Sequence, residues 1–234
     1  MPLNIPGATP EQLGQQLHRE FEAGSIYVHA TNLPLSGEAL DESREYVQRA
    51  ASILGHLTLT NDTLGSEVWV LDSATSPNSQ FIPYHTDNPY LDEPEQLVSF
   101  WNLKSSDVGG ENLLLPVSGL VTWAEGEQVF DAVMDEITAT SVTFAHNDRL
   151  ARAPMINLVD MTARFDMKYI TPEFHALGLR FAEMLRTYGA TLPGIKLQPG
   201  EALAFNNRSL LHARAPYVDE RRISLRTRVQ ELAI

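Results

Sequence analysis

Apolar residues recur every four positions at Leu13, Leu17 and Phe21, a spacing that predicts an amphipathic helix with one core-facing stripe. The four residues 9–12 read Thr-Pro-Glu-Gln. They predict the start of this helix, because they combine a capping box with proline at the first helical position. Gly24 predicts its end.

Further helices and strands follow from the same patterning. Helical spacing recurs over residues 38–54 and 128–137, and again from residue 171 with apolar positions at 177, 181 and 185. Strand-like runs occupy residues 25–30, 67–73, 96–103, 112–117, 141–145, 155–159, 202–205, 210–214 and 221–229. Gly109-Gly110 predicts a hairpin turn between 96–103 and 112–117. The pattern indicates one α+β domain over residues 1–234.

The last predicted strand carries a row of basic side chains. Alternation puts Ile223, Leu225 and Val229 on one face. The other face then presents Arg222, Ser224, Arg226 and Arg228. A solvent-facing strand would explain this row, but six arginines between residues 208 and 228 are unusual in a chain of net charge −13.

The acidic balance and the absence of cysteine narrow the class of protein. A net charge of −13 argues against nucleic-acid and anionic-membrane partners. The chain has no cysteine, which excludes disulfides, thiolate metal sites and cysteine nucleophiles. No secretory signal or membrane-length apolar run is visible, so we expect a cytoplasmic protein. The oligomeric state is not indicated.

The stretch "PYHTDNPY" at residues 83–90 holds the strongest candidate chemistry. If it is extended, His85 and Asp87 point the same way and converge on one point. His212 lies in a later strand just after a turn, so sheet geometry also fixes its direction. Two histidines and one carboxylate suit the facial triad of a non-haem Fe(II) oxygenase or a catalytic zinc site. The five remaining histidines, His18, His29, His56, His146 and His175, are interpreted as having no functional role.

The row of arginines favours the iron site over the zinc site, because it offers a partner for a dicarboxylate cosubstrate. Guanidinium binds carboxylates bidentately and stays charged when it is desolvated. Arg222 and Arg226 follow His212 by ten and fourteen residues. A cosubstrate that chelates the metal at one end and carries a free carboxylate at the other would fit this layout, and 2-oxoglutarate is such a molecule.

Four ordered segments resemble the TauD/TfdA group of Fe(II)/2-oxoglutarate-dependent dioxygenases, which includes relatives of clavaminate synthase. They are "YHTDNPY", "DVGGENLLLPV", "LQPGEALAFNNRSLLHAR" and "RRISLR". The resemblance implies a double-stranded β-helix (jelly roll) core with flanking helices, and iron held by His85, Asp87 and His212. It also implies that Arg222 binds the side carboxylate of 2-oxoglutarate, while Arg226 faces the substrate or shares the cosubstrate role.

Two positions depart from the family pattern. Asn112 stands where relatives often have a threonine that assists 2-oxoglutarate, and its amide can donate the same hydrogen bond. Asn206-Asn207 replaces a common Asp-Asn pair, which we interpret as a turn variant of little chemical consequence.

The expected reaction is hydroxylation of a small molecule, such as an amino acid or natural-product intermediate, with O2 as oxidant and succinate and CO2 as co-products. Near the metal motif, the residues expected to line the substrate pocket are Tyr84, Asn88, Tyr90 and Trp101, together with Arg226. A zinc hydrolase with the same triad and a non-catalytic jelly-roll binding protein are the alternatives.

Overall fold

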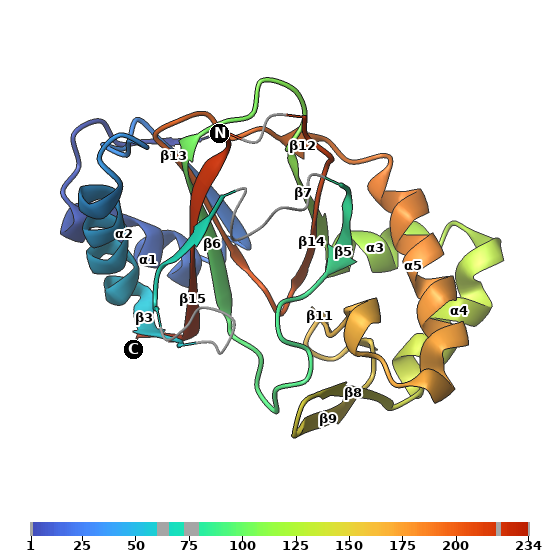
Figure 1. The fold of residues 1–234 in the computed structure, drawn as a ribbon. Coiled ribbons are helices and arrows are strands. Elements are labelled where there is room, and N and C mark those ends of the chain that lie inside the picture. The colour runs from blue at the N-terminus through green and yellow to red at the C-terminus, as the bar shows by residue number, and fades with distance from the viewer. Residues whose placement is uncertain (1, 60–65, 73–79, 219–220, 234) are drawn as a thin grey trace.

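Two β-sheets face each other in the computed structural model, which describes residues 2–59, 66–72, 80–218 and 221–233 (Figure 1). The larger sheet has the order β1-β2-β13-β6-β15-β3, with β4 also paired to β15. Its strands are β1 (Leu3–Asn4), β2 (Tyr27–Thr31), β3 (Gly55–Leu57), β4 (Trp69–Leu71), β6 (Leu97–Lys104), β13 (Glu201–Asn206) and β15 (Ile223–Leu232). The smaller sheet, of order β12-β7-β14-β5, contains β5 (Ile82–His85), β7 (Asn112–Pro116), β12 (Gly194–Ile195) and β14 (Leu210–Arg214).

The chain crosses repeatedly from one sheet to the other. Strands β4, β6, β13 and β15 lie in the larger sheet, while β5, β7, β12 and β14 lie in the smaller one. The hairpin predicted at Gly109-Gly110 is therefore wrong, because β6 and β7 belong to different sheets. Both glycines adopt the positive φ expected of a turn, 75° and 81°, but this turn joins the two sheets.

Helices cover the outer face of each sheet (Figure 1). Helices α1 (Pro10–Glu22) and α2 (Leu40–Leu54) pack on the larger sheet. On the smaller sheet lie α3 (Val117–Ala124), α4 (Asp131–Ala139) and α5 (His175–Gly189). The capping box predicted for α1 is confirmed, since the Thr9 side chain accepts from Gln12 N and the Gln12 side chain accepts from Thr9 N.

Several predicted boundaries were wrong. Val117 starts α3, a helix that the sequence pattern did not reveal, so strand 112–117 ends one residue earlier. The strand predicted over 155–159 shrinks to β10 (Ile156–Asn157), which pairs with β11 (Thr162–Ala163), because the chain turns there and leaves Val159 90% exposed. Ser73, the last residue of predicted strand 67–73, lies outside the described residues.

A third apolar cluster fills the space between the sheets, with Val98, Leu114, Leu197, Leu203, Phe205 and Leu210 at its centre. Burying both faces of each sheet explains why the inner and outer strand positions are both apolar. A small hairpin of β8 (Val142–His146) and β9 (Arg149–Ala153) extends from the end of the molecule (Figure 1). Among the described residues, no helix has both the length and the apolar character to span a bilayer.

Candidate active site

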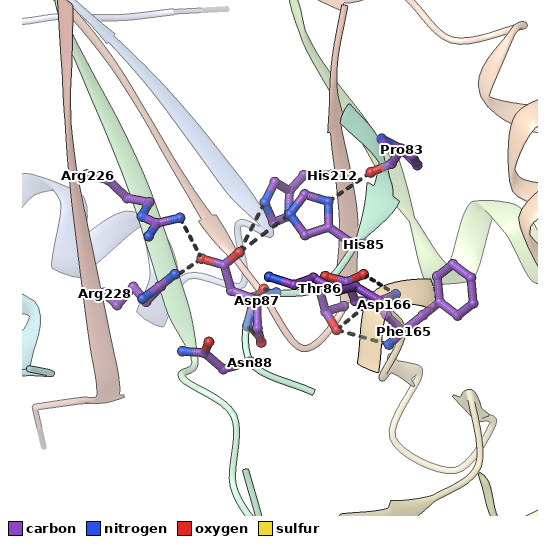
Figure 2. A network of polar contacts seen from close by, with 12 residues as sticks. Pro83, His85, Thr86, Asp87, Asn88, Phe165, Asp166, His212, Arg226 and Arg228 are labelled. Atoms are coloured by element: carbon purple, nitrogen blue, oxygen red, sulfur yellow. Dashed lines mark hydrogen bonds and ion pairs between the residues drawn. The ribbon is translucent and has the colours of Figure 1, made fainter. Parts of the chain in front are cut away.

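His85, Asp87 and His212 converge in the space between the two sheets, as their sequence positions predicted (Figure 2). His85 ends β5 and is paired in register with His212 of β14. The Nε2 atoms of His85 and His212 lie 3.5 and 3.7 Å from Asp87 Oδ1. One ligand atom from each of the three residues lies within 4.8 Å of the others, a spacing that suits a single metal ion.

The orientation of His85 is fixed by its backbone neighbour. Its Nδ1 lies 2.8 Å from the Pro83 carbonyl oxygen, so Nδ1 carries a proton and donates, and Nε2 is the nitrogen that faces Asp87. Burial lowers the pKa of His85, but its hydrogen bond to Asp87 and the Asp87 charge outweigh burial and raise the pKa overall. Burial and the neighbouring His85 hold the pKa of His212 well below its usual value. One imidazole is thus kept neutral and ready to ligate.

Two arginines of β15 approach Asp87 Oδ2, the carboxylate oxygen that faces away from the two histidines (Figure 2). Arg228 Nε donates to Asp87 Oδ2 at 2.7 Å, and Arg226 Nη1 lies 3.6 Å from the same oxygen. Burial alone would raise the pKa of Asp87, but the charges of Arg228 and Arg226 hold it well below its usual range. Alternation along the strand predicted that both arginines share one face, but it gave Arg228 no partner; their spacing of two residues was the available signal.

Asn207 fixes the backbone of Asp87, a contact that the interpretation of Asn206-Asn207 as a turn variant did not predict. Asn207 is fully buried. Its Oδ1 accepts from Asp87 N at 2.7 Å, and its Nδ2 donates to the carbonyl oxygens of Asp87 and Glu95 at 3.2 and 3.1 Å. The turn between β13 and β14 therefore holds the segment of His85 and Asp87 in place, although Asn207 lies 120 residues after Asp87 in the chain.

Arg222 and Asn112 lie together, away from Arg226. Both line a small cavity next to the Gly109-Gly110 turn. Asn112 Nδ2 donates to Ile195 O at 3.3 Å, while the Arg222 guanidinium lies 5.7 Å from the Tyr217 ring. Burial, with a contribution from nearby Arg214, lowers the pKa of Arg222 to about 10. No described carboxylate pairs with Arg222, so a buried cation is left for an anionic ligand.

A cavity of about 760 Å³ opens beside the triad. Arg226 and Arg228 line it, and so do the predicted Asn88 and Tyr90. Asn88 Nδ2 donates to the buried Glu95 carboxylate at 2.8 Å, and Tyr90 OH donates to Asn88 Oδ1 at 2.9 Å.

The other two aromatic residues expected in the pocket lie elsewhere, so that prediction is wrong for both. Trp101 is 0% exposed in the core beneath α1 and α2, and its Nε1 donates to Ser99 Oγ. Its neighbour Phe100, on the opposite face of β6, approaches His212 with ring centroids 6.1 Å apart. Tyr84 likewise points away from His85 and packs in the core formed with α5. Successive side chains of β5 and β6 point to opposite faces, so the residue next to one that faces the site points away from it.

Several cavity residues carried no signal in the sequence. His146 was interpreted as non-functional, yet it lines the cavity and packs against Tyr90 and Tyr169, with ring centroids 4.8 and 5.0 Å away. His56 also lines the cavity. His29 lies elsewhere, with its Nε2 3.0 Å from Glu201 Oε2. These contacts join segments far apart in the chain, so spacing alone does not reveal them.

Asp166 is a further carboxylate of the cavity and lies close to His85 and Thr86 (Figure 2). The preceding residue, Phe165, donates its backbone N–H to Thr86 Oγ1 at 3.0 Å and accepts from Thr86 N at 2.7 Å. These bonds hold Asp166 beside the segment of His85 and Asp87. Burial raises the pKa of Asp166. Trp69 of β4 completes the aromatic lining next to Arg226.

Residues 2–228 match the family described as taurine catabolism dioxygenase TauD, TfdA family. The chain belongs to this family. The match spans nearly the whole sequence and includes all the residues of the triad and both predicted anion-binding arginines. No curated protein sequence matches the chain.

Solved structures with the same fold share little sequence with the chain. Asparagine oxygenase in complex with Fe(II), 2S,3S-3-hydroxyasparagine and succinate has a TM-score of 0.77 at 17% identity, over 93% of this chain and 79% of that one. PvcB from Pseudomonas aeruginosa has a TM-score of 0.69 at 17% identity, over 98% and 87%. The non-haem iron oxygenase OrfP, in complex with Fe and α-ketoglutaric acid, has a TM-score of 0.69 at 12% identity, over 94% and 80%. These similarities establish the mixed α/β fold.

Proposed function

We propose that the protein is an Fe(II)- and 2-oxoglutarate-dependent dioxygenase that hydroxylates a small molecule of the amino-acid class and forms succinate and CO2. The observation that carries this proposal is the convergence of His85, Asp87 and His212 beside a cavity, with a separate buried cation at Arg222. Family membership supports it. So do the structural neighbours, which include complexes with Fe, α-ketoglutaric acid, hydroxyasparagine and L-Arg.

The proposed architecture is a double-stranded β-helix in one domain. Its support is the strand order, in which four strands of the larger sheet, β4-β15-β6-β13, match four of the smaller, β5-β14-β7-β12. Successive strands alternate between the two sheets, as a jelly roll requires. The metal ligands then lie inside the double layer, with His85 at the end of β5, Asp87 just beyond it and His212 in the middle of β14.

The donor set fits iron. Two imidazole nitrogens and one carboxylate oxygen from one side form the facial arrangement of non-haem Fe(II) oxygenases. The hydrogen bond from His85 to Pro83 presents Nε2 to this site, and Asp87 turns one oxygen toward both rings. When bound, Fe(II) and 2-oxoglutarate would supply the activation of O2 and its coupling to decarboxylation.

We assign the remaining work to groups that bind and orient. Arg222 and Asn112 hold the distal carboxylate of 2-oxoglutarate, since Arg222 is a buried guanidinium that pairs with no described carboxylate. Arg226 faces the substrate cavity, where its guanidinium is held against Trp69. Tyr90, His146 and Tyr169 pack on one another along the cavity and exclude water there.

The charges of the cavity favour a zwitterionic substrate. Arg226 and Arg228 line this cavity, whereas Arg222 lines a separate one, and the two cavity arginines can accommodate an anionic group of the substrate. We assign that group, a substrate carboxylate, to Arg226. Asp166 lines the same cavity and accepts from Lys168 N only among the described residues, so its free lone pairs can receive a substrate ammonium. A location in the cytoplasm remains a prediction from the sequence.

Release of succinate tests this function. The purified protein with Fe(II), 2-oxoglutarate and O2 should form succinate, and amino acids and their derivatives should be screened for stimulation of that reaction. His212→Ala should abolish succinate formation. A zinc hydrolase or a binding protein with the same triad would form none, and that result in the wild type would overturn the proposal.

A further inference from the structure

A short hydrogen bond joins Arg228 to the carboxylate of Asp87. Arg228 Nε lies 2.7 Å from Asp87 Oδ2, and both side chains are only 6% exposed. A charged hydrogen bond of this length inside the protein fixes both partners more firmly than a surface ion pair would. Figure 2 shows Arg228 approaching Asp87 from β15, on the side opposite the histidine rings.

The two oxygens of Asp87 have different partners. Oδ1 faces His85 Nε2 and His212 Nε2, at 3.5 and 3.7 Å. Oδ2 faces the arginines and has a full hydrogen bond to Arg228. Asn207 also bonds the backbone N and O of Asp87. The Asp87 residue is therefore restrained at its backbone by Asn207 and at its carboxylate by Arg228.

Arg226 is less suited to this task, although it reaches the same oxygen. Its Nη1 lies 3.6 Å from Asp87 Oδ2, beyond hydrogen-bond range. Its guanidinium stacks on Trp69 at 4.4 Å and is 13% exposed, about twice as much as that of Arg228. The geometry thus divides the pair, with Arg228 directed at the metal ligand and Arg226 at the cavity.

We propose that Arg228 is a positioning residue for the metal centre, which occupies Asp87 Oδ2 and presents Oδ1 as the only ligating oxygen of that carboxylate. The inference rests on the proposed function, since it needs a metal at the triad. It identifies a residue outside the triad, sixteen positions after His212, that sets how the carboxylate binds.

Two opposing effects decide what loss of Arg228 does. A guanidinium near the metal repels it, so removing the charge alone would tighten binding. Removing the hydrogen bond lets the carboxylate rotate and leaves it poorly compensated in a buried place. Loss of the outer partner of a metal ligand typically lowers metal affinity 10- to 100-fold, which indicates that orientation outweighs repulsion.

The test measures metal binding in the absence of turnover. Co(II), a spectroscopic substitute for Fe(II), is titrated into metal-free wild type, Arg228→Met, Arg228→Gln and Arg228→Lys, with Fe(II) competition for confirmation. Arg208→Met is the matched control, because Arg208 is a part-buried arginine whose guanidinium donates to the carbonyl oxygens of Pro94 and Gln230 and not to Asp87. Circular dichroism and Tm establish which variants are folded.

We expect Co(II) to bind Arg228→Met about 10- to 100-fold more weakly than wild type, with altered visible bands. Arg228→Lys should recover part of the loss, and Arg208→Met should match wild type in affinity and spectrum. Equal or tighter binding by Arg228→Met would overturn the inference; if that variant does not fold, equal or tighter binding by Arg228→Gln has the same force. Failure of the wild type to bind Co(II) would instead overturn the proposed function.

Discussion

Trp69 and Arg226 are direct partners in the β4–β15 ladder, and the Arg226 guanidinium carbon lies 4.4 Å from the centre of the Trp69 ring. The contact is a cation–π interaction at the wall of the cavity. It restricts the rotamers of a long side chain, so less entropy is lost when the guanidinium binds an anion. If Arg226 binds the substrate as proposed, Trp69 therefore holds its side chain in place for that contact.

Replacing Trp69 should weaken substrate binding through Arg226. A cation–π interaction contributes about 0.5–2 kcal/mol. Trp69→Leu should accordingly raise the substrate KM about two- to thirtyfold and leave the cosubstrate KM nearly unchanged. Trp69→Phe keeps an aromatic face and should retain most of the affinity. Steady-state kinetics with the substrate and 2-oxoglutarate varied in turn decide this, and equal effects of Leu and Phe would argue against the stacking role.

Metal binding should release one proton near pH 6.5. Although burial lowers it, the pKa of His85 is raised overall by Asp87, so His85 holds a proton that the metal must displace. Burial and the neighbouring His85 hold the pKa of His212 well below its usual 6.5, so His212 is already neutral. Apparent affinity should fall about tenfold per pH unit below the raised pKa of His85 and level off above it.

Calorimetry in buffers of different ionisation enthalpy measures that proton. About one proton per metal at pH 6.5 is the expected result. Release of two would mean that both imidazoles are protonated before binding, contrary to the environment of His212.

Local alternation is the part of the site that the sequence predicted well. Arg226 and Arg228 lie two residues apart on β15, and Asp87 follows His85, the last residue of β5, by two positions and lies in a bend. The two arginines share a face because of strand geometry, whereas Asp87 meets His85 from a bend whose backbone Asn207 holds. The assignments of Tyr84 and Trp101 failed by the same rule, because each is one residue out of register with a side chain that faces the site.

The contacts between distant segments could not be predicted from one sequence. Asn207 bonds Asp87 across 120 residues, and Asp166 reaches the site through the pairing of Phe165 with Thr86. The sheet that each strand joins could not be predicted either. A hairpin was predicted at Gly109-Gly110, but β6 and β7 join different sheets. Periodicity gives the direction of a side chain but does not give its partner.

Asn207 should contribute strongly to stability as well as to the site. Asn207→Ala leaves Asp87 N and two buried carbonyl oxygens without their partner. Such losses cost about 1–3 kcal/mol for each buried group, and partial compensation by water gives an expected total of about 2–4 kcal/mol. Tm should fall by roughly 4–16 °C. Asn4→Ala removes one exposed side-chain bond and is the control, with an expected effect within about 0.5 kcal/mol.

Arg222 and Arg226 should fail in different ways when they are shortened. They are four residues apart, which separates them by about 13 Å at a rise of roughly 3.3 Å per residue, and they line different cavities. Arg222→Met should raise the cosubstrate KM, measured with 2-oxoglutarate varied, by orders of magnitude. Loss of a buried cation leaves the bound carboxylate uncompensated, at a typical cost of about 3–5 kcal/mol.

Arg226→Met should mainly raise the substrate KM, provided that the substrate carries an anionic group. Its effect on 2-oxoglutarate should be small, since Arg226 lies with Asp87 and Trp69 and does not line the cavity of Arg222 and Asn112. Titration of the Co(II)-loaded variants with 2-oxoglutarate separates binding from turnover. If Arg226→Met lost 2-oxoglutarate binding while Arg222→Met kept it, the two roles would have to be exchanged, and the small cavity beside Asn112 would need another ligand.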